Sequence, residues 1–228
     1  MTGRAYYPLF ANLRGRRCVV VGCGPVARRK IKELLSCGAD VTVICPGPAR
    51  TPEAASSPGR IRHVRRRFRA SDLRGAWLVC AATDDERVND AVFRAACRRR
   101  ILANVVDRTD RCTFVAPALL RRGRVVIAIS TGGASPALAR RLRERVGRMI
   151  DPSYGRLAAM LASLRAVAKR RLPSPERRKR YFLRVVDGRA GALARAGLRA
   201  AARRESLALL ARMERGRRTP RATRSGNG

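Results

Sequence analysis

The chain has 228 residues, 46% of them hydrophobic, and its 52 Lys and Arg against 16 Asp and Glu give a formal net charge of +36. This length allows one large domain, or a medium domain with a smaller one, and the apolar content suffices for a packed core. No apolar run approaches the roughly 18 residues that span a bilayer. The N-terminus lacks the apolar region of a signal peptide, so we expect a cytoplasmic protein without membrane contact.

The seven cysteines are scattered singly, and His63 is the only histidine. This pattern fits neither a disulfide framework nor ordinary metal-ligand spacing, so we predict no metal site and a structural role for His63. Cys23 differs from the others because it lies in a glycine-rich turn, where a redox role is the minor alternative to a buried thiol. All but four of the basic residues are arginines spread along the chain, which is more typical of compositional bias than of a nucleic-acid patch.

Six short apolar segments have the composition of β-strands, and helical patterns separate several of them. Such alternation predicts βαβ units and a parallel sheet. The predicted strands are residues 18–21, 41–45, 61–64, 77–81, 102–106 and 125–129.

The first strand runs directly into Gly22-x-Gly24-x-x-Ala27, followed by an amphipathic segment. This strand–turn–helix context is typical of a dinucleotide site, although a purely structural βα turn is the alternative. Gly22 permits the tight turn, Gly24 lets the backbone approach a pyrophosphate, and Pro25 suits the first helical position. The helix N-terminus would face the phosphates. Its predicted buried face consists of Ala27, Ile31, Leu34 and Leu35.

The fourth strand is followed by Thr83-Asp-Asp-Glu86, which predicts a capping box with Thr83 as N-cap of a helix ending near Arg99. Asp84 and Asp85 then belong to the first turn, where the helix dipole favours carboxylates. Thr83 also follows the carboxyl end of a strand, where ligands bind in open α/β sheets. Both roles are compatible.

The fifth strand contains Asn104, and Asp107 follows directly at its carboxyl end. On position alone, Asp107 either caps the following turn or acts as a general acid/base or substrate-orienting group beside the cofactor. The acidic residue that usually binds a ribose 2′-OH about 20 residues after the first glycine is missing, since this region reads Val41-Thr-Val-Ile-Cys-Pro-Gly47. The motif therefore does not choose between NAD and NADP.

After residue 129 the pattern changes. Ser130-Thr-Gly-Gly-Ala-Ser-Pro136 predicts a turn ending in an N-cap serine and an N1 proline. The next helix has Leu138, Leu142, Val146 and Met149 on one face. Further helices are predicted at 153–171, 175–187 and 190–214, and the basic segment 215–228 is predicted to be disordered.

Five motifs occur in the order found in precorrin-2 dehydrogenases, which are often also sirohydrochlorin ferrochelatases of siroheme synthesis, and the chain resembles this family through about residue 188. The motifs are Tyr7-Pro-Leu-Phe10, the glycine turn through Lys30, Ala81-Ala-Thr-Asp-Asp85, Asn104-Val-Val-Asp107 and Ser130-Thr-Gly-Gly-Ala-Ser-Pro136. The chain departs from the family at Cys23, where glycine is usual, and at Thr131, where serine is common. It lacks the methyltransferase domain of some members, so we expect a standalone member.

The resemblance implies NAD as the cofactor, a role for Asp107 in dehydrogenation, and precorrin-2 as the substrate, converted to sirohydrochlorin. The expected cofactor contacts are Gly22, Gly24, Pro25, Val26, Pro46, Gly47 and Thr83. The expected substrate contacts are Asn104, Ser130, Thr131, Gly132, Ser135 and Arg140, with Arg141 nearby. A multiply carboxylated tetrapyrrole would also suit the basic surface.

We therefore predict an α/β fold: a Rossmann-type parallel-sheet domain over 1–112, a dimerisation segment over 113–150, a small all-helical domain over 151–214 and a tail over 215–228. We expect a homodimer that builds the active site between subunits. Fe²⁺ would be a further substrate if the chain also chelates metal; no residue decides this, and we expect ferrochelatase activity to be weak or absent. The alternative function is an NAD-sensing regulator that binds nucleic acid, although no recognition helix or stacking motif is visible.

Overall fold

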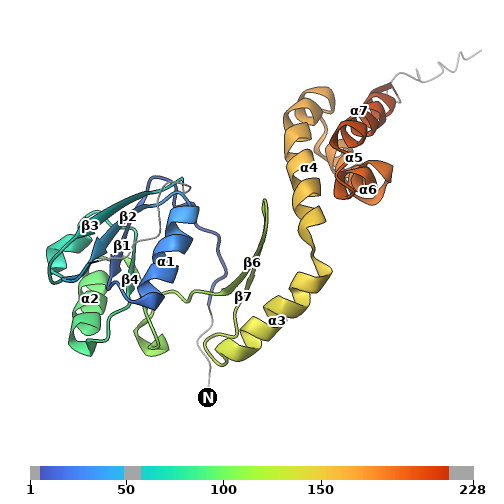
Figure 1. Cartoon of the computed structure of the whole chain (residues 1–228). Helices are drawn as coiled ribbons and strands as arrows, with labels where there is room; N and C mark the ends of the chain where they lie inside the picture. The colour runs from blue at the N-terminus through green and yellow to red at the C-terminus, as the bar shows by residue number, and fades with distance from the viewer. Residues whose placement is uncertain (1–5, 49–57, 216–228) are drawn as a thin grey trace, which may run out of the picture. The chain divides into compact units, whose positions relative to one another are not determined.

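The computed structural model describes residues 6–48 and 58–215. The chain divides into two compact units (Figure 1), the first comprising Met1–Pro117 and Ser130–Pro136 and the second Ala118–Ile129 and Ala137–Gly228.

The first unit is built on a five-stranded parallel sheet in the order β3-β2-β1-β4-β5. Its strands are β1 (Arg17–Val21), β2 (Asp40–Ile44), β3 (Arg60–Val64), β4 (Leu78–Ala81) and β5 (Leu102–Val105). The prediction of a parallel sheet is confirmed, and every predicted strand of this unit is present with its ends shifted by at most one residue. Because the strand order reverses direction at β1 and β4, their carboxyl ends form the crevice where such sheets bind ligands.

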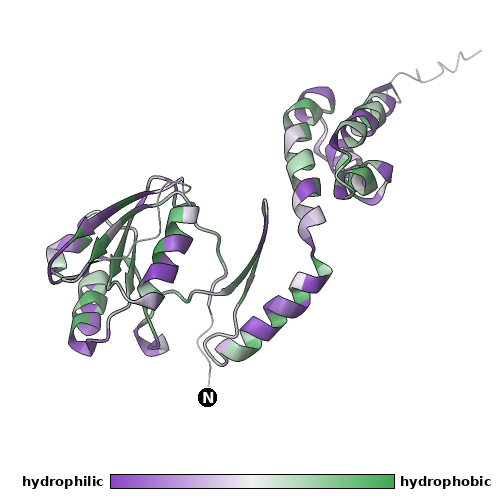
Figure 2. Cartoon of the chain, viewed as in Figure 1, coloured by the Kyte–Doolittle hydropathy of each residue, from purple (hydrophilic) through white to green (hydrophobic). Residues whose placement is uncertain are grey.

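Helices α1 (Pro25–Ser36) and α2 (Glu86–Arg98) cover opposite faces of this sheet. Side chains alternate along β1, so Val20 packs in the cluster that contains α1, while Val19 and Val21 pack in the cluster that contains α2. Figure 2 shows apolar strands between helices whose outer faces are polar. The predicted buried face of α1 is confirmed at Ala27, Ile31, Leu34 and Leu35.

The start of α1 at Pro25 is confirmed, but the predicted capping box at the start of α2 is wrong. The N-cap is Asp85, whose carboxylate accepts hydrogen bonds from the backbone N–H groups of Arg87 (2.9 Å) and Val88 (3.3 Å). Asp85 reaches two orphan N–H groups and is itself charged, so it complements the helix dipole better than a neutral Thr83 hydroxyl.

The second unit begins with an antiparallel hairpin of β6 (Ala118–Arg122) and β7 (Val125–Ile129). The sequence analysis missed β6 because its Ala-Leu-Leu-Arg-Arg sequence lacks β-branched residues. α3 (Pro136–Met149) follows, and its predicted proline at the first position is confirmed. Arg122 links the hairpin to the end of α3, donating hydrogen bonds to the carbonyl oxygens of Ile150 (3.0 Å) and Gly147 (3.3 Å).

Four further helices form an apolar cluster around Leu172, Tyr181 and Leu210, all fully buried. They are α4 (Pro152–Arg171), α5 (Pro175–Asp187), α6 (Arg189–Arg195) and α7 (Arg199–Arg215). The single helix predicted over 190–214 is wrong, because Gly197 adopts a φ of +87° and ends α6 there. Of the predicted disordered tail, only Arg215 lies within the described residues. None of the helices over 6–48 and 58–215 combines the length and apolar character needed to cross a membrane.

Candidate dinucleotide-binding site

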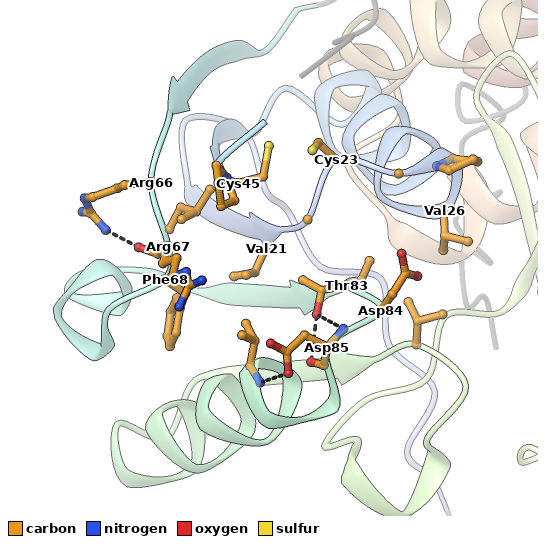
Figure 3. Close-up of a pocket in the computed structure, with 18 of the residues that line it drawn as sticks. Val21, Cys23, Val26, Cys45, Arg66, Arg67, Phe68, Thr83, Asp84 and Asp85 are labelled. Carbon is orange, nitrogen blue, oxygen red and sulfur yellow. Dashed lines mark hydrogen bonds between the residues drawn. The ribbon is translucent and has the colours of Figure 1, made fainter. Parts of the chain in front are cut away.

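A cavity of about 530 Å³ lies at the carboxyl edge of the parallel sheet. It is bounded by the turn after β1, the end of β2, the segment after β3, the turn after β4 and the end of the β5 segment (Figure 3). Its size falls within the range of small-molecule and cofactor pockets. The cavity therefore occupies the position where the sequence analysis placed a dinucleotide.

The turn after β1 is held against the neighbouring strands. The N–H of Gly22 donates to the carbonyl of Ile44 at 2.9 Å, and Gly22 has a φ of +114°. A Cβ at this position would lie 2.2 Å from the carbonyl oxygen of Ala82. Only glycine fits at position 22, because both the positive φ and the nearby Ala82 carbonyl exclude a side chain.

Gly24 differs from Gly22, because its φ of −68° and ψ of −178° are accessible to any residue. A Cβ at Gly24 would meet no atom within 4 Å among the described residues. The chain itself therefore gives no reason for glycine at position 24, whereas close approach of a pyrophosphate would give one.

The N-terminus of α1 borders the cavity through Gly24, Pro25 and Val26. Among the described residues no side chain caps this helix end, and the first turn of α1 carries no acidic residue. The first N–H groups of a helix lack internal partners and form the positive end of the helix dipole. This terminus thus has the free donors and the polarity that a phosphate group requires.

Thr83 lines the cavity, and Asn89 holds it in place. The Thr83 hydroxyl donates to Oδ1 of Asn89 at 2.9 Å, and Nδ2 of Asn89 donates to the Thr83 carbonyl at 2.9 Å. Asn89 is buried on α2. The sequence analysis missed this residue, although a polar side chain on the apolar face of a predicted helix is a recognisable signal.

Asp107 also lines the cavity, and its backbone is unusual, with a φ of +60°. Aspartate tolerates this left-handed conformation better than most residues, yet it still costs free energy. Within 6–48 and 58–215, no hydrogen bond or ion pair engages its carboxylate, so it does not cap the following turn there. Of the two predicted roles of Asp107, the geometry favours a group that faces a ligand.

Asn104 is not among the residues that line the cavity. Its side chain is 8% exposed, and Nδ2 donates to the carbonyl of Phe114 at 3.2 Å and contacts Sγ of Cys112 at 3.4 Å. The Cys112 sulfur also accepts from the N–H of Val105 at 3.3 Å. These contacts fix the strand end that precedes Asp107.

The segment after β3 contributes cavity residues that the sequence analysis missed: Arg66, Arg67 and Phe68. Arg66 forms a two-pronged ion pair with Asp72, with N–O distances of 2.6 and 2.8 Å, and this pair lowers the pKa of the Asp72 carboxyl. For the Arg67 guanidinium, the described part of the chain offers no such partner. Since carboxyl ends of parallel strands share one edge, the predicted third strand could have indicated this segment.

Most of the predicted cofactor residues line this cavity together with Asp107, whereas none of the predicted substrate residues is among the residues that line it. Those that border the cavity are Gly22, Gly24, Pro25, Val26, Pro46, Thr83 and Asp107. Gly47 follows Pro46 but does not line the cavity. Its carbonyl accepts a hydrogen bond from the Cys45 thiol at 3.3 Å. Arg140 and Arg141 are exposed on α3, in the second unit.

The turn from Ser130 to Pro136 is ordered by its own side chains. The Thr131 hydroxyl accepts from the N–H of Ser135 at 3.0 Å and donates to its carbonyl at 3.1 Å, while Ser130 accepts from the N–H of Gly132 at 3.1 Å. None of these four residues borders the cavity. A preformed turn of this kind presents backbone and hydroxyl groups at low entropic cost.

The sheet order, the geometry of Gly22 and Gly24, and the uncapped N-terminus of α1 are those of a Rossmann-type dinucleotide-binding protein. Family models match three consecutive regions: "Putative NAD(P)-binding" over residues 9–118, "Sirohaem biosynthesis protein central" over 122–149 and "Sirohaem synthase dimerisation region" over 153–210. The chain belongs to the siroheme-synthesis family in which the sequence analysis placed it, the precorrin-2 dehydrogenase family.

Known relatives agree with this assignment. The siroheme synthase of Methylobacillus flagellatus is 43% identical over 196 residues, covering 86% of this chain and 42% of the relative. That of Methylococcus capsulatus is 43% identical over 192 residues, covering 84% and 40%. The chain thus spans about two fifths of the length of these relatives. Among solved structures, "SirC, precorrin-2 dehydrogenase" has a TM-score of 0.70 at 29% identity, covering 91% of this chain and 100% of SirC.

Proposed function

We propose that this protein oxidises precorrin-2 to sirohydrochlorin with NAD as the hydride acceptor. The observation that carries the proposal is one cavity with an uncapped helix end on one side and the Asp107 carboxylate, without a partner among the described residues, on another. The first suits a pyrophosphate and the second suits proton transfer or substrate positioning. The structure of SirC and the siroheme synthases named above support the choice of substrate.

In this proposal the bound dinucleotide supplies the redox chemistry by accepting a hydride from the macrocycle. The protein orients the reactants. The turn at Gly22 and Gly24 and the first residues of α1 hold the pyrophosphate, and Thr83 and Pro46 border the rest of the bound dinucleotide. Asp107 receives or directs the proton that the macrocycle loses. Asn104 acts indirectly, by fixing the strand end before Asp107 through Cys112 and Phe114.

For the substrate, we propose that the turn Ser130–Ser135 and Arg140 contact the macrocycle carboxylates. Arginine binds carboxylates through two parallel N–H groups, which suits a multiply charged substrate. The net charge of +36 adds long-range attraction. We also propose a homodimer, since residues 153–210 match a dimerisation region and α3 leaves Leu138 half exposed and Met149 largely exposed.

NAD rather than NADP remains part of the proposal, because it rests on family resemblance. The end of β2 supplies no acidic residue for a ribose 2′-OH, and Arg67 is a basic group at the neighbouring edge. Paired titrations with NAD and NADP test the choice, and tighter binding of NADP would contradict it.

The decisive experiment is anaerobic incubation of the protein with precorrin-2 and NAD, followed at the absorbance of NADH. We expect NADH to appear together with sirohydrochlorin. Asp107→Asn is the matched control, because asparagine has the same shape and also tolerates the left-handed backbone. Absence of reduced cofactor with both NAD and NADP would refute the proposed function.

A further inference from the structure

Two cysteine thiols meet at the edge of the dinucleotide cavity. Cys23 is the middle residue of the phosphate turn, and Cys45 directly follows β2. β1 and β2 pair in register from Arg17 and Asp40 to Val21 and Ile44, so the residues after each strand are neighbours. Figure 3 shows the sulfur atoms of Cys23 and Cys45 turned toward each other at the edge of the cavity.

The Cys45 thiol has a carbonyl oxygen and a histidine ring as polar neighbours. Its Sγ lies 3.3 Å from Nε2 of His63 and donates to the Gly47 carbonyl at 3.3 Å. Burial and, after it, the neighbouring Cys23 thiol raise the pKa of the Cys45 thiol to about 12, so attack by this sulfur requires a nearby group that takes up its proton. An unprotonated His63 Nε2 is within reach to accept that proton.

The other cysteines have different environments. Among the residues that line the cavity, Cys23 and Cys45 are the cysteines. Cys18 and Cys80 are buried in the cluster under α1, and Cys112 is buried against β5. A small oxidant that enters the cavity therefore meets the Cys23–Cys45 pair first.

We propose that Cys23 and Cys45 form a reversible oxidation site that switches off dinucleotide binding. A peroxide oxidises the Cys23 thiol to a sulfenic acid and is reduced to water or an alcohol. The Cys45 sulfur then attacks the Cys23 sulfur, hydroxide leaves and becomes water with the proton that Cys45 passes to His63, and a disulfide forms. The two thiols lose two electrons in total, and the peroxide gains them.

The loss of dinucleotide binding follows from the position of the Cys23–Cys45 disulfide, and this inference rests on the proposed dinucleotide site. Cys23 lies between Gly22 and Gly24, so a disulfide constrains the backbone that must approach the pyrophosphate. The same bond removes the Cys45 thiol from the Gly47 carbonyl. We expect oxidation to weaken NAD binding by roughly tenfold or more, and bound NAD to protect both thiols.

The test treats the whole protein with limited hydrogen peroxide, maps disulfides by peptide mass spectrometry, and measures NAD affinity before oxidation, after it, and after dithiothreitol. We expect a peptide linking Cys23 to Cys45 and a loss of affinity that dithiothreitol reverses. Cys23→Ser and Cys45→Ser should remove the loss caused by peroxide. Cys97→Ser, an exposed position on α2, is the matched control and should keep it. His63→Gln should slow disulfide formation.

Three results would overturn the proposal: no linked peptide, a linked peptide with unchanged NAD affinity, or a peroxide effect that persists in Cys45→Ser. The peptide map of the wild type decides the first point even if a serine variant misfolds, and Cys45→Ala serves as a second variant. If the reduced protein fails to bind NAD, the proposed dinucleotide site is refuted, whereas the linked peptide still reports on the thiol pair.

Discussion

Gly22 and Gly24 stand two residues apart, and the structure predicts opposite results for replacing each with alanine. Gly22→Ala places a Cβ 2.2 Å from the Ala82 carbonyl oxygen at a φ of +114°. Ala82 cannot move freely, because its N–H donates to the Val21 carbonyl at 2.8 Å. The variant must strain the backbone or disrupt the pairing of β1 with β4.

The size of the Gly22→Ala effect follows from two contributions. A left-handed backbone costs an L-residue about 1–2 kcal/mol, and forcing an extra methyl into a packed position costs about 1–3 kcal/mol. We therefore expect a loss of roughly 3–4 kcal/mol. For a chain of this length that corresponds to a fall in Tm of roughly 10 °C.

Gly24→Ala should leave folding nearly unchanged. The backbone angles are ordinary, and the Cβ meets nothing within 4 Å among the described residues. Alanine is a poorer N-cap than glycine by about 1 kcal/mol, and the smaller conformational freedom of the unfolded alanine chain offsets part of that cost. We expect a stability change within about 1 kcal/mol. NAD affinity should nevertheless fall by roughly tenfold to a hundredfold, because the added methyl would clash with the bound pyrophosphate and such a clash costs about 1–3 kcal/mol.

The assay is thermal unfolding of both variants without cofactor, followed by calorimetric titration with NAD. Unchanged stability of Gly22→Ala would refute the steric argument. A Gly24→Ala variant that binds NAD as tightly as the wild type would show that the pyrophosphate does not pass this turn.

Four further outcomes are expected. Asp107→Asn should lower the rate of NADH formation by about a hundredfold or more and leave the unfolding temperature unchanged. Full activity in steady-state assays would contradict the proposed role of this carboxylate. Burial raises the pKa of Cys80 from 9.0 to about 12, so the unfolded chain releases this proton first, and Cys80 should lower the free energy of unfolding above pH 9 by up to about 1.4 kcal/mol per pH unit. The pKa values of Cys18 and Cys45 are raised as well, so Cys80→Ala should reduce the slope in urea unfolding from pH 8 to 10 without abolishing it, and an unchanged slope would count against this reasoning. Sedimentation at micromolar concentration should show a dimer that Leu138→Glu weakens, whereas a wild-type monomer would contradict our proposal. Sirohydrochlorin with Fe²⁺ or Co²⁺ should gain metal at the rate without protein; rapid insertion lost in Asp107→Ala would show that we underestimate chelation.

Local sequence patterns predicted the parallel sheet and α1 well, because strand composition, glycine spacing and helical periodicity all pointed to the same structure. The errors arose where several residues compete for one role. Thr83 and Asp85 are both good N-caps, and only the path of the chain shows that Asp85 meets the free N–H groups. Likewise, a single glycine at 197 divides a pattern that is otherwise continuously helical.

The candidate site was predicted in part for a similar reason. Residues that follow a recognised strand directly, such as Gly22 and Thr83, were found from their position in sequence. Arg67 was missed because it reaches the cavity through the segment after β3, and Asn89 was missed because it acts on Thr83 through the packing of α2. Asn104 was expected to contact the substrate because it belongs to the Asn104–Asp107 motif of the resembled family; in the structure its amide donates a hydrogen bond to the Phe114 carbonyl, and its contact with substrate stays a prediction.

Asp107 shows what the structure adds to a sequence pattern. An aspartate after a strand and before a turn has two roles that look identical in sequence, since both place a carboxylate at the same point of the chain. The roles differ in hydrogen bonding: a capping carboxylate accepts from the turn it stabilises, whereas a carboxylate that meets a ligand must stay accessible. The left-handed φ of +60° adds cost without any compensating hydrogen bond among the described residues. That cost is understandable if the conformation is needed to direct the carboxylate into the cavity. Asparagine also tolerates this conformation and has the same shape, so Asp107→Asn removes the charge and leaves the backbone unchanged, whereas alanine alters both.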